Sequence, residues 1–207
     1  KKFYLFGFNS NNQIYAHHIQ CRGFETTFQV SFLGQDLGVF ELNVPGKHNI
    51  YNALAAIGVA CNLGIEPSII KKAMKNFVNA NRRFQFIGEK DKVVVVDDYA
   101  HHPTEIKCTL KCIKNRFPDS RIIVVFQPHQ YSRTRFLLKE FAMSFSDADK
   151  VVVPDIYFVR DSIIEQKFVN AKMLVEKIRK NGKEALYLPS FDEIVEYLCE
   201  IVQRDDV

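Results

Sequence analysis

The order of hydrophobic and polar positions divides the chain into two parts that meet near residue 80. In the first part, short apolar runs alternate with polar turns, and segment 26–32 places Thr, Phe, Val and Phe at every second position. Such alternation is typical of antiparallel strands with one solvated face. We expect an alanine-rich helix at 52–63 and a second helix at 67–77 to follow the strands. The expected strands are residues 3–8, 14–21, 24–32 and 39–44.

In the second part, patterns of buried strands alternate with patterns of amphipathic helices. The run Val93 to Val96 is too short and too β-branched for a helix, and Pro103 suits the first turn of a following helix. Strand and helix alternating at this interval predict right-handed βαβ units and a doubly wound, mostly parallel sheet. The expected strands are 92–96, 121–126, 150–153 and 185–188, and the expected helices are 103–116, 132–145, 169–180 and 191–202.

These patterns predict an α/β protein of two domains. Residues 1–79 form an α+β domain, and residues 80–207 form a Rossmann-like domain. Segment 78–83 has no periodicity and is the best candidate for a linker.

Composition narrows the class of protein without naming an activity. The chain has 207 residues, of which 47% are hydrophobic and 25% charged, so it can fill one large or two small cores. The net charge of +4 is spread along the chain, and no basic stripe is interleaved with aromatic residues. Nucleic-acid binding is therefore not expected. No apolar run reaches the length of about 18 residues that a membrane span needs.

The cysteines indicate a reducing compartment. Their number, five, is odd, and none stands in a C-x-x-C pair, which argues against a disulfide framework and a zinc ribbon. Cys108 and Cys112 lie four apart on an expected helix and could share a metal ion, although buried free thiols are common. We therefore expect a cytoplasmic protein.

Polar side chains gather in the loops that follow three of the expected parallel strands. Parallel strands of one sheet end at the same edge, where open α/β sheets bind ligands. The loops are residues 97–105, 127–135 and 154–161. They should converge into one candidate ligand site.

Histidines and aspartates are the titratable residues that make these loops candidates for a functional site. His101, His102 and His129 share the expected edge with Asp97 and Asp98, and a cluster of titratable groups favours a functional site. A lone histidine near a strand end is more often structural, and Asp97 is as well explained as a turn or helix-capping residue.

One arginine suits an anionic ligand. Arg133 stands at an expected helix N-terminus, where its guanidinium would add to the charge of the free N–H groups and could bind a carboxylate or a phosphate. Arg135 and Arg160 are more simply explained as residues of solvated faces.

The common phosphate-binding motifs are missing from this sequence. Gly46-Lys47-His48 suggests a P-loop, but the position five before Gly46 is Glu41, and His48 stands where magnesium binding needs Ser or Thr. No G-x-G-x-x-G follows any expected strand. Phosphates are therefore held by arginine and a helix N-terminus, or by a part outside this chain.

Five motifs in register resemble the Mur ligases of peptidoglycan synthesis. The resemblance covers nearly the whole chain, and two of the motifs, His101 to Glu105 and Gln127 to Thr134, are those of the members that add the first amino acid. The motifs are Gly46 to Ala56, Arg82 to Phe84, Asp97 to Glu105, Phe126 to Thr134 and Asp155 to Tyr157.

The resemblance implies a domain assignment. Residues 1–79 resemble the second half of the family's central P-loop ATPase domain, and residues 80–207 its C-terminal domain without the last strands. The family's P-loop, magnesium ligands and UDP-sugar domain have no counterpart in these residues, so the fragment by itself is expected to be inactive.

The resemblance also implies an activity, which is ATP-dependent amide formation. The carboxylate of UDP-N-acetylmuramate takes the γ-phosphoryl group of ATP, and the amine of L-alanine then displaces phosphate from the acyl phosphate. The expected small-molecule partners are these two substrates and ATP. The expected cofactors are ATP and Mg²⁺, with the metal ligands on the missing part.

Site residues follow from the resemblance position by position. His48, Asn49 and Asn52 would contact adenine, Arg83 the ATP phosphates and Asp98 the ribose hydroxyls. For Asn49 and Asn52, helix capping remains the alternative.

The amino-acid substrate would be surrounded by residues of the first two loops. The carboxylate of the amino acid would bind Arg133, and the catalytic residues would be Tyr99, His101 and Arg133. Relatives often carry a second arginine where this chain has Gln130, with Arg135 as a possible substitute. The full set expected around the substrate is Tyr99, His101, His102, His129 and Arg133.

Two other functions stay open. One is another ligase of the same family, such as one that recycles intact tripeptide. The other is a non-catalytic nucleotide-binding or regulatory module. The sequence does not decide the oligomeric state.

Overall fold

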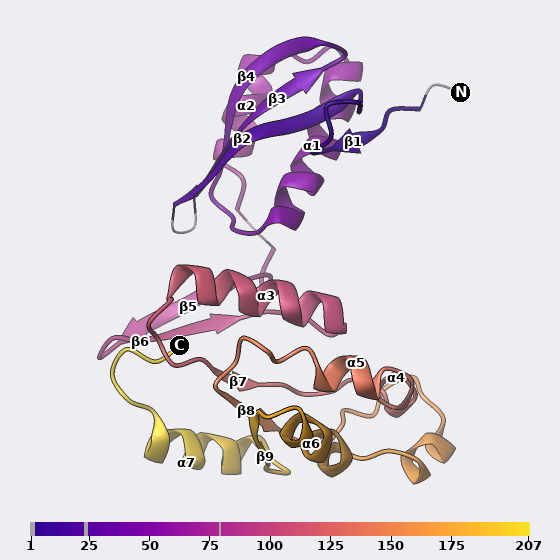
Figure 1. The fold of residues 1–207 in the computed structure, drawn as a ribbon, viewed down its shortest axis with the longest axis vertical. Helices are drawn as coiled ribbons and strands as arrows, with labels where there is room; N and C mark the ends of the chain where they lie inside the picture. The colour runs from indigo at the N-terminus through magenta and orange to yellow at the C-terminus, as the bar shows by residue number, and fades with distance from the viewer. Residues whose placement is uncertain (1–2, 23–24, 79) are drawn as a thin grey trace. The chain divides into compact units, whose positions relative to one another are not determined.

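The computed structural model describes residues 3–22, 25–78 and 80–207. These residues form two compact units, Lys1–Asn81 and Arg82–Val207 (Figure 1). The expected strand at 24–32 begins at Glu25, because residues 23 and 24 lie outside the described residues. Residue 79, within the expected linker, also lies outside them.

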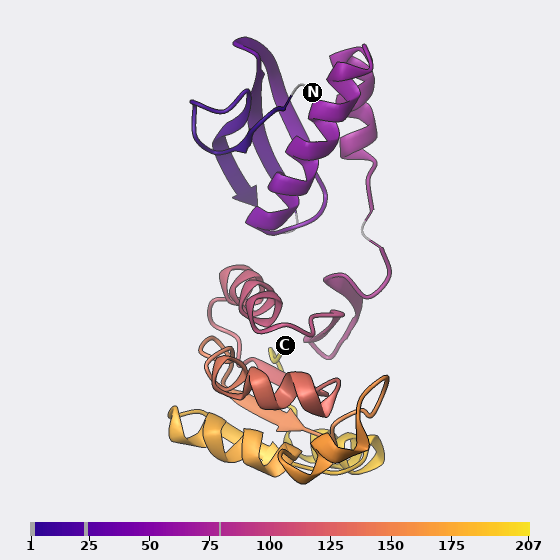
Figure 2. The ribbon, with the colours of Figure 1, turned by 90° about the vertical axis from the view of Figure 1, so that its right-hand side faces the viewer.

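The first unit is a four-stranded sheet covered on one face by two helices, as Figure 2 shows. The antiparallel pairing expected for this region is confirmed for β2, β3 and β4, whereas the short β1 pairs parallel with β2. Phe28, Val30 and Phe40 are fully buried between sheet and helices. The elements are β1 (Phe6–Gly7), β2 (Ile14–Arg22), β3 (Glu25–Phe32), β4 (Gln35–Leu42), α1 (Lys47–Asn62) and α2 (Pro67–Lys75).

Helix α1 begins five residues before the expected start at residue 52. Gly46 precedes its first turn with φ of 101°, a conformation that glycine adopts without a steric penalty. The sequence 47–51 lacks the alanines that indicate the rest of the helix, and for this reason its pattern did not predict the first turn. The earlier start places His48 and Asn49 in the helix itself.

The second unit contains the expected α/β alternation. Strands β7, β8 and β9 form a parallel sheet in the order β7-β8-β9, and Val151, Val152 and Val153 of the middle strand are fully buried. The strands are β5 (Gln85–Lys90), β6 (Val93–Asp97), β7 (Ile123–Val125), β8 (Lys150–Val153) and β9 (Glu184–Tyr187). The helices are α3 (Pro103–Arg116), α4 (Tyr131–Phe136), α5 (Leu138–Ala142), the 3₁₀ helix η1 (Ile163–Lys167), α6 (Ala171–Lys180) and α7 (Phe191–Ile201).

Two details of this unit differ from the expectation. β6 pairs antiparallel with β5, a strand that the patterns did not predict, because residues 85–90 mix apolar, glycine and charged positions without a clean alternation. The expected helix 132–145 is interrupted at Leu137, whose φ of −106° and ψ of 19° are not helical. The helix at 191–202 is confirmed as α7, and Ser190 accepts from the N–H of Glu193 as its N-cap.

A buried ion pair anchors residues 206 and 207 in the second unit. Arg121 donates through Nε and Nη2 to the two oxygens of Asp206, at 3.0 and 2.6 Å, and the Asp206 side chain is 5% exposed. Burial works to raise the pKa of Asp206, but the hydrogen bonds from Arg121 and from the N–H of Gln203 outweigh it and hold that pKa below its usual value.

Replacing Asp206 by asparagine is therefore expected to lower the free energy of unfolding by about 2 kcal/mol at neutral pH. This value allows for solvent screening of the ion pair, because the Arg121 side chain is one-third exposed. A carboxyl whose pKa is depressed on folding stabilises the protein above its unfolded pKa, and this stabilisation is lost as pH falls through the folded pKa. The difference in the free energy of unfolding between Asp206→Asn and the wild type should thus shrink below about pH 4. Urea unfolding across pH measures it, with Asp205→Asn, whose side chain is 65% exposed, as the matched control. A difference that did not vary with pH would contradict this assignment.

Candidate functional site

The loops that follow β7 and β8 are joined by backbone hydrogen bonds. Gln130 N–H donates to Tyr157 O at 3.0 Å, and Tyr157 N–H donates to Pro128 O at 2.8 Å. His129 and Tyr157 thus form a parallel bridge beyond the ends of the strands. The predicted convergence of these two loops is present in the structure.

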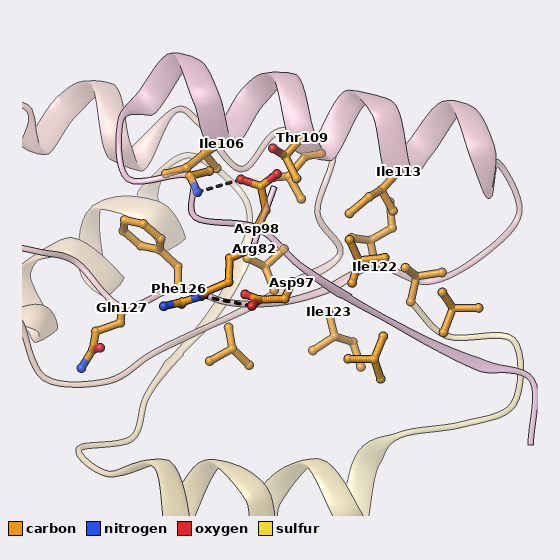
Figure 3. A pocket seen from close by; sticks show the side chains of 18 of the residues that line it. Arg82, Asp97, Asp98, Ile106, Thr109, Ile113, Ile122, Ile123, Phe126 and Gln127 are labelled. Carbon is orange, nitrogen blue, oxygen red and sulfur yellow. Dashed lines mark hydrogen bonds and ion pairs between the residues drawn. The ribbon is translucent and has the colours of Figure 1, made fainter. Parts of the chain in front are cut away.

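The loop after β6 reaches the same edge. A cavity of about 510 Å³ is lined at one end by residues 97–101 and by Gln127 and His129, so the first and second loops face a common space. Figure 3 shows Asp97, Asp98 and Gln127 around this end of the cavity. The strand pattern, together with the rule that the loops after parallel strands meet at one edge of a sheet, predicted this meeting point.

Asp98 fixes the shape of the first loop. Its Oδ2 accepts from Phe84 N–H at 2.9 Å, and its Oδ1 accepts from Ala100 N–H at 2.7 Å. A carboxylate has about four lone-pair sites, so both oxygens can still accept from a ligand hydroxyl. The neighbouring Asp97 accepts from Arg82 Nε at 3.1 Å, an ion pair rather than the turn or helix-capping role considered for it.

His102 is the N-cap of α3. Its Nδ1 accepts from Thr104 N–H, and Glu105 Oε2 accepts from His102 N–H, so the two side chains form a capping box. The structure therefore gives His102 a role in the helix, in addition to the substrate contact that the resemblance implies.

The tautomer of His101 follows from its partners. Its Nδ1 lies 2.9 Å from the carbonyl oxygen of Tyr99, which can only accept, so Nδ1 carries the proton and Nε2 presents a lone pair. Glu105 Oε2 lies 3.5 Å from the same Nδ1 and accepts from His101 N–H at 3.0 Å. His101 can thus accept a proton or a hydrogen bond at Nε2.

Aromatic rings connect the three loops. The Tyr99 ring lies edge-on to His101, with centroids 5.2 Å apart, and 6.4 Å from His129, which lies 5.1 Å from Tyr157. The guanidinium of Arg82 lies 5.4 Å from the Tyr99 ring centroid, within cation–π range. The edge therefore combines flat apolar surfaces with positive charge.

The positive charge at this edge acts on His129. Burial lowers the pKa of His129 most, and the positive charges of Arg133 and Arg82, together with that of His101 when it is protonated, lower it further.

We expect His129 to be neutral at pH 7, with an NMR titration midpoint below 6.5. Arg133→Ala should raise that midpoint, because one repelling charge is removed, whereas Arg160→Ala, at an exposed residue of the third loop, should leave it unchanged. A midpoint that does not move in Arg133→Ala would show that Arg133 lies away from His129.

The third loop supports the helix that bears Arg133. Asp161 Oδ2 accepts from Ser132 N–H at 2.9 Å, in the first turn of α4. Burial works to raise the pKa of Asp161, but hydrogen bonds from Ser132, Ser162 and Tyr131 hold it below its usual value. A negative charge at a helix N-terminus stabilises the helix, so Asp161 keeps α4 in place.

Arg135 forms an ion pair with Glu165. Its Nε lies 2.8 Å from Glu165 Oε2 and its Nη2 donates to Oε1 at 3.1 Å, a two-point contact with η1. Its guanidinium also lies 5.0 Å from the Phe168 ring centroid. The structure therefore gives Arg135 a partner within the protein, which disfavours it as the substitute for the arginine missing at Gln130.

The nucleotide-binding residues expected in the first unit lie on the first turns of α1. Asn49 is buried and its Nδ2 donates to Pro45 O at 2.7 Å, while Asn52 is exposed and its Nδ2 lies 3.4 Å from Asn49 Oδ1. The N-cap is Gly46, and no side chain caps the helix there, so capping does not account for either asparagine. His48 is exposed.

Sequence reasoning missed three residues that shape the site. Glu105 binds the first loop and lies 3.9 Å from Arg83 Nη1, Arg82 stacks on Tyr99, and Asp161 caps α4. The capping-box spacing between His102 and Glu105 could have indicated the role of Glu105, but histidine is not among the usual N-cap residues. Arg82 and Asp161 act through contacts between segments that are separate in the sequence, and no local pattern shows such contacts.

A metal-binding cluster and a membrane-spanning helix were looked for among the residues that the structure describes. Within them, no three His, Cys, Asp or Glu side chains are grouped to hold a metal ion, and neither Cys108 nor Cys112 is part of a disulfide. Across the same ranges, no helix has the length and apolar character to cross a membrane.

A parallel sheet with converging polar loops at one edge places the second unit in the doubly wound α/β class, whose members bind ligands at that edge. Family comparison identifies it more closely. Residues 82–207 match the glutamate ligase domain of Mur ligases, and residues 1–60 match the Mur ligase middle domain. The chain belongs to the Mur ligase family.

Individual relatives agree with this family. The UDP-N-acetylmuramate–L-alanine ligase of Caldanaerobacter subterraneus subsp. tengcongensis is 48% identical over 181 residues, which cover 87% of this chain and 39% of the relative. The ligase of the same name from Acetivibrio thermocellus is 45% identical over 206 residues, covering 98% of this chain and 43% of the relative. The chain thus spans about two-fifths of the length of these curated relatives.

A solved structure shows the same fold. The crystal structure of the UDP-N-acetylmuramate-alanine ligase from Thermotoga maritima superposes with a TM-score of 0.78 at 27% identity, over 98% of this chain and 42% of that one. The doubly wound α/β fold expected from the alternating pattern is therefore confirmed.

Proposed function

We propose that this chain is part of an ATP-dependent ligase that joins L-alanine to the carboxylate of UDP-N-acetylmuramate. The observation that carries the proposal is the edge of the second unit, where Tyr99, His101 and His129 meet beside the charge of Arg133. The names of the relatives at 39–48% identity support the same reaction. In this proposal, residues 1–79 belong to the central ATPase domain and residues 80–207 to the C-terminal domain.

The chemistry has two steps. A carboxylate oxygen of UDP-N-acetylmuramate attacks the γ-phosphorus of ATP, the bond to the β-γ bridging oxygen breaks, and ADP leaves. The amine of L-alanine then attacks the acyl carbon, phosphate leaves with that carboxylate oxygen, and the amine loses a proton. Positioning and charge stabilisation supply most of the rate enhancement in such transfers.

The second unit would bind the amino acid. Arg133 would hold its carboxylate through paired hydrogen bonds, and Tyr99, His102 and His129 would line its surroundings. Nε2 of His101, which presents a lone pair, would accept a hydrogen bond or the proton from the attacking amine. Asp98 would accept from ribose hydroxyls and Arg83 would contact phosphate.

The first unit would contact the base of the nucleotide. Asn52 and His48 are exposed on α1, and an amide offers both the donor and the acceptor that a purine edge requires. Asn49 has one Nδ2 proton engaged by Pro45 O, so its role would be to orient Asn52 through the contact between their amides.

Magnesium is expected to act with ATP, but no step through it is assigned to this chain. The described residues hold no group of three metal-ligating side chains, so the ligands would come from elsewhere in the protein. Use of ATP and the presence of free thiols fit a cytoplasmic location.

Phosphate release tests the proposal. The full-length protein, given ATP, Mg²⁺ and UDP-N-acetylmuramate, should release phosphate only when L-alanine is present. Equal or faster release with an intact tripeptide as the amine would favour the recycling ligase instead. ATP binding without release under any of these conditions would favour the non-catalytic module.

A further inference from the structure

Two neighbouring histidines of β2 lie together on the sheet of the first unit. Consecutive residues of a regular strand point to opposite faces, but the Nδ1 atoms of His17 and His18 are 3.1 Å apart and their ring centroids 4.7 Å. A bulge in β2 brings the two rings together. The register with β3 shifts between His17 and Gln20, so two residues of β2 oppose one residue of β3, and His18 has a φ of 49°.

The histidine pair lies on the face of the sheet opposite the two helices. His17 pairs with Gln29 of β3. Phe28 and Val30, on either side of Gln29, are fully buried in the core that the sheet forms with α1 and α2 (Figure 2). Alternation therefore directs His17 and Gln29 away from that core. His17 is half-buried and His18 is exposed, so the described residues leave both rings accessible.

An amide oxygen faces the same point as the two rings. Gln29 Oε1 lies 3.0 Å from His18 Nδ1. The other end of the amide fixes its orientation, because Gln29 Nε2 donates to Asp36 Oδ2 at 2.7 Å and an ionised carboxylate can only accept. Asp36 is itself held by Gly38 N–H, which donates to its Oδ1 at 2.7 Å.

A single proton lies between the three atoms. Because Gln29 Oε1 only accepts, His18 Nδ1 carries the proton, and His17 Nδ1 presents its lone pair to the same hydrogen. Three electron-pair donors therefore converge on the place of one hydrogen. A metal ion can take that place if His18 loses the proton at Nδ1, gains one from water at Nε2 and stays neutral.

The distance between the two histidines suits one transition-metal ion. An ion bonded at about 2.0–2.1 Å to two nitrogens 3.1 Å apart makes an N–metal–N angle of about 100°, between the square-planar and tetrahedral values. Neutral imidazoles favour Zn²⁺ and its neighbours in the first transition row, whereas Mg²⁺ and Ca²⁺ require oxygen ligands. An amide oxygen and water complete a four-coordinate site for Zn²⁺.

We propose that His17 Nδ1, His18 Nδ1 and Gln29 Oε1 bind one Zn²⁺ ion, with a water molecule as the fourth ligand. Asp36 orients the amide, as the hydrogen-bond partners of metal ligands commonly do. Two histidines and one amide differ in kind from a group of three His, Cys, Asp or Glu side chains, which the described residues do not form. The ion joins the bulge of β2 to β3, and its binding stabilises the folded first unit.

Zinc binding to the full-length protein tests this site. The protein is stripped of metal with a chelator and dialysed against ZnCl₂ at a series of concentrations, and His18→Gly is compared with the wild type. Glycine adopts the positive φ of residue 18 without strain, so this variant keeps the bulge and loses only the imidazole. The Kd for one Zn²⁺ ion should rise roughly 100-fold in His18→Gly, and roughly 10-fold in Asp36→Ala, where the amide is no longer oriented.

Leu33→Gly is the matched control for His18→Gly. Leu33 also has a positive φ, 51°, and lies exposed in the turn between β3 and β4. This variant should bind Zn²⁺ as the wild type does.

Nitrogen NMR of the histidine rings gives an independent readout. Zn²⁺ should shift the Nδ1 signals of His17 and His18, and millimolar Mg²⁺ should leave them in place. Equal Zn²⁺ binding by the wild type and His18→Gly would overturn the proposal. Nδ1 signals that do not respond to Zn²⁺, or that respond equally to Mg²⁺, would overturn it as well.

Discussion

Replacing Arg133 by alanine is expected to raise the L-alanine concentration that the full-length enzyme requires by roughly 100-fold, or about 2.7 kcal/mol. The guanidinium is proposed to hold the carboxylate of the amino acid in two charge-assisted hydrogen bonds, which a methyl group cannot replace. The KM for ATP should change little. Steady-state phosphate release at varied L-alanine concentration measures both constants.

Arg160→Ala is the matched control for that variant, because Arg160 is an exposed arginine of the neighbouring loop. It should leave the requirement for L-alanine within a factor of about two of wild type, the range usual for an exposed residue. If Arg133→Ala behaved like this control, the carboxylate would have to bind elsewhere on the sheet edge.

The largest effect on stability is expected at Phe141. Its side chain is fully buried, and its ring centroid lies 5.4 Å from that of Phe126, which immediately follows β7. Phe141→Ala should therefore lower the free energy of unfolding by about 3–5 kcal/mol, through lost burial and the cavity left behind. Urea unfolding monitored by circular dichroism measures the change.

Phe136 provides the comparison for Phe141, since it lies on the neighbouring short helix with 71% of its surface exposed. Its ring contacts the Arg135 guanidinium at 4.6 Å, and Phe136→Ala should cost under about 1 kcal/mol. Equal losses in the two variants would contradict the core assigned to this unit.

The fold was largely predictable where apolar periodicity was strong. The valine run of β8 and the amphipathic pattern of α6 gave elements within two residues of those observed. Strand β5 was not predictable, because Gly88 and two charged residues remove its alternation and its pairing with β6 comes from tertiary contact. The first turn of α1 depends on the positive φ of Gly46, which propensity does not reveal.

The candidate site was predictable in its location but not in its internal contacts. The rule that parallel strands end at one edge brought together the loops of His101, His129 and Tyr157. The hydrogen bond that sets the tautomer of His101 and the capping of α4 by Asp161 join groups whose distance depends on packing. A linear pattern of residues does not contain that distance.

One measurement tests the proposed reaction most directly. The full-length protein is given ATP, L-alanine and UDP-N-acetylmuramate labelled with ¹⁸O in its carboxylate, and the released phosphate is analysed by mass spectrometry. An acyl phosphate intermediate predicts one ¹⁸O in each phosphate and an amide to alanine in the product. Phosphate without ¹⁸O, or ¹⁸O found in AMP, would contradict the proposed reaction.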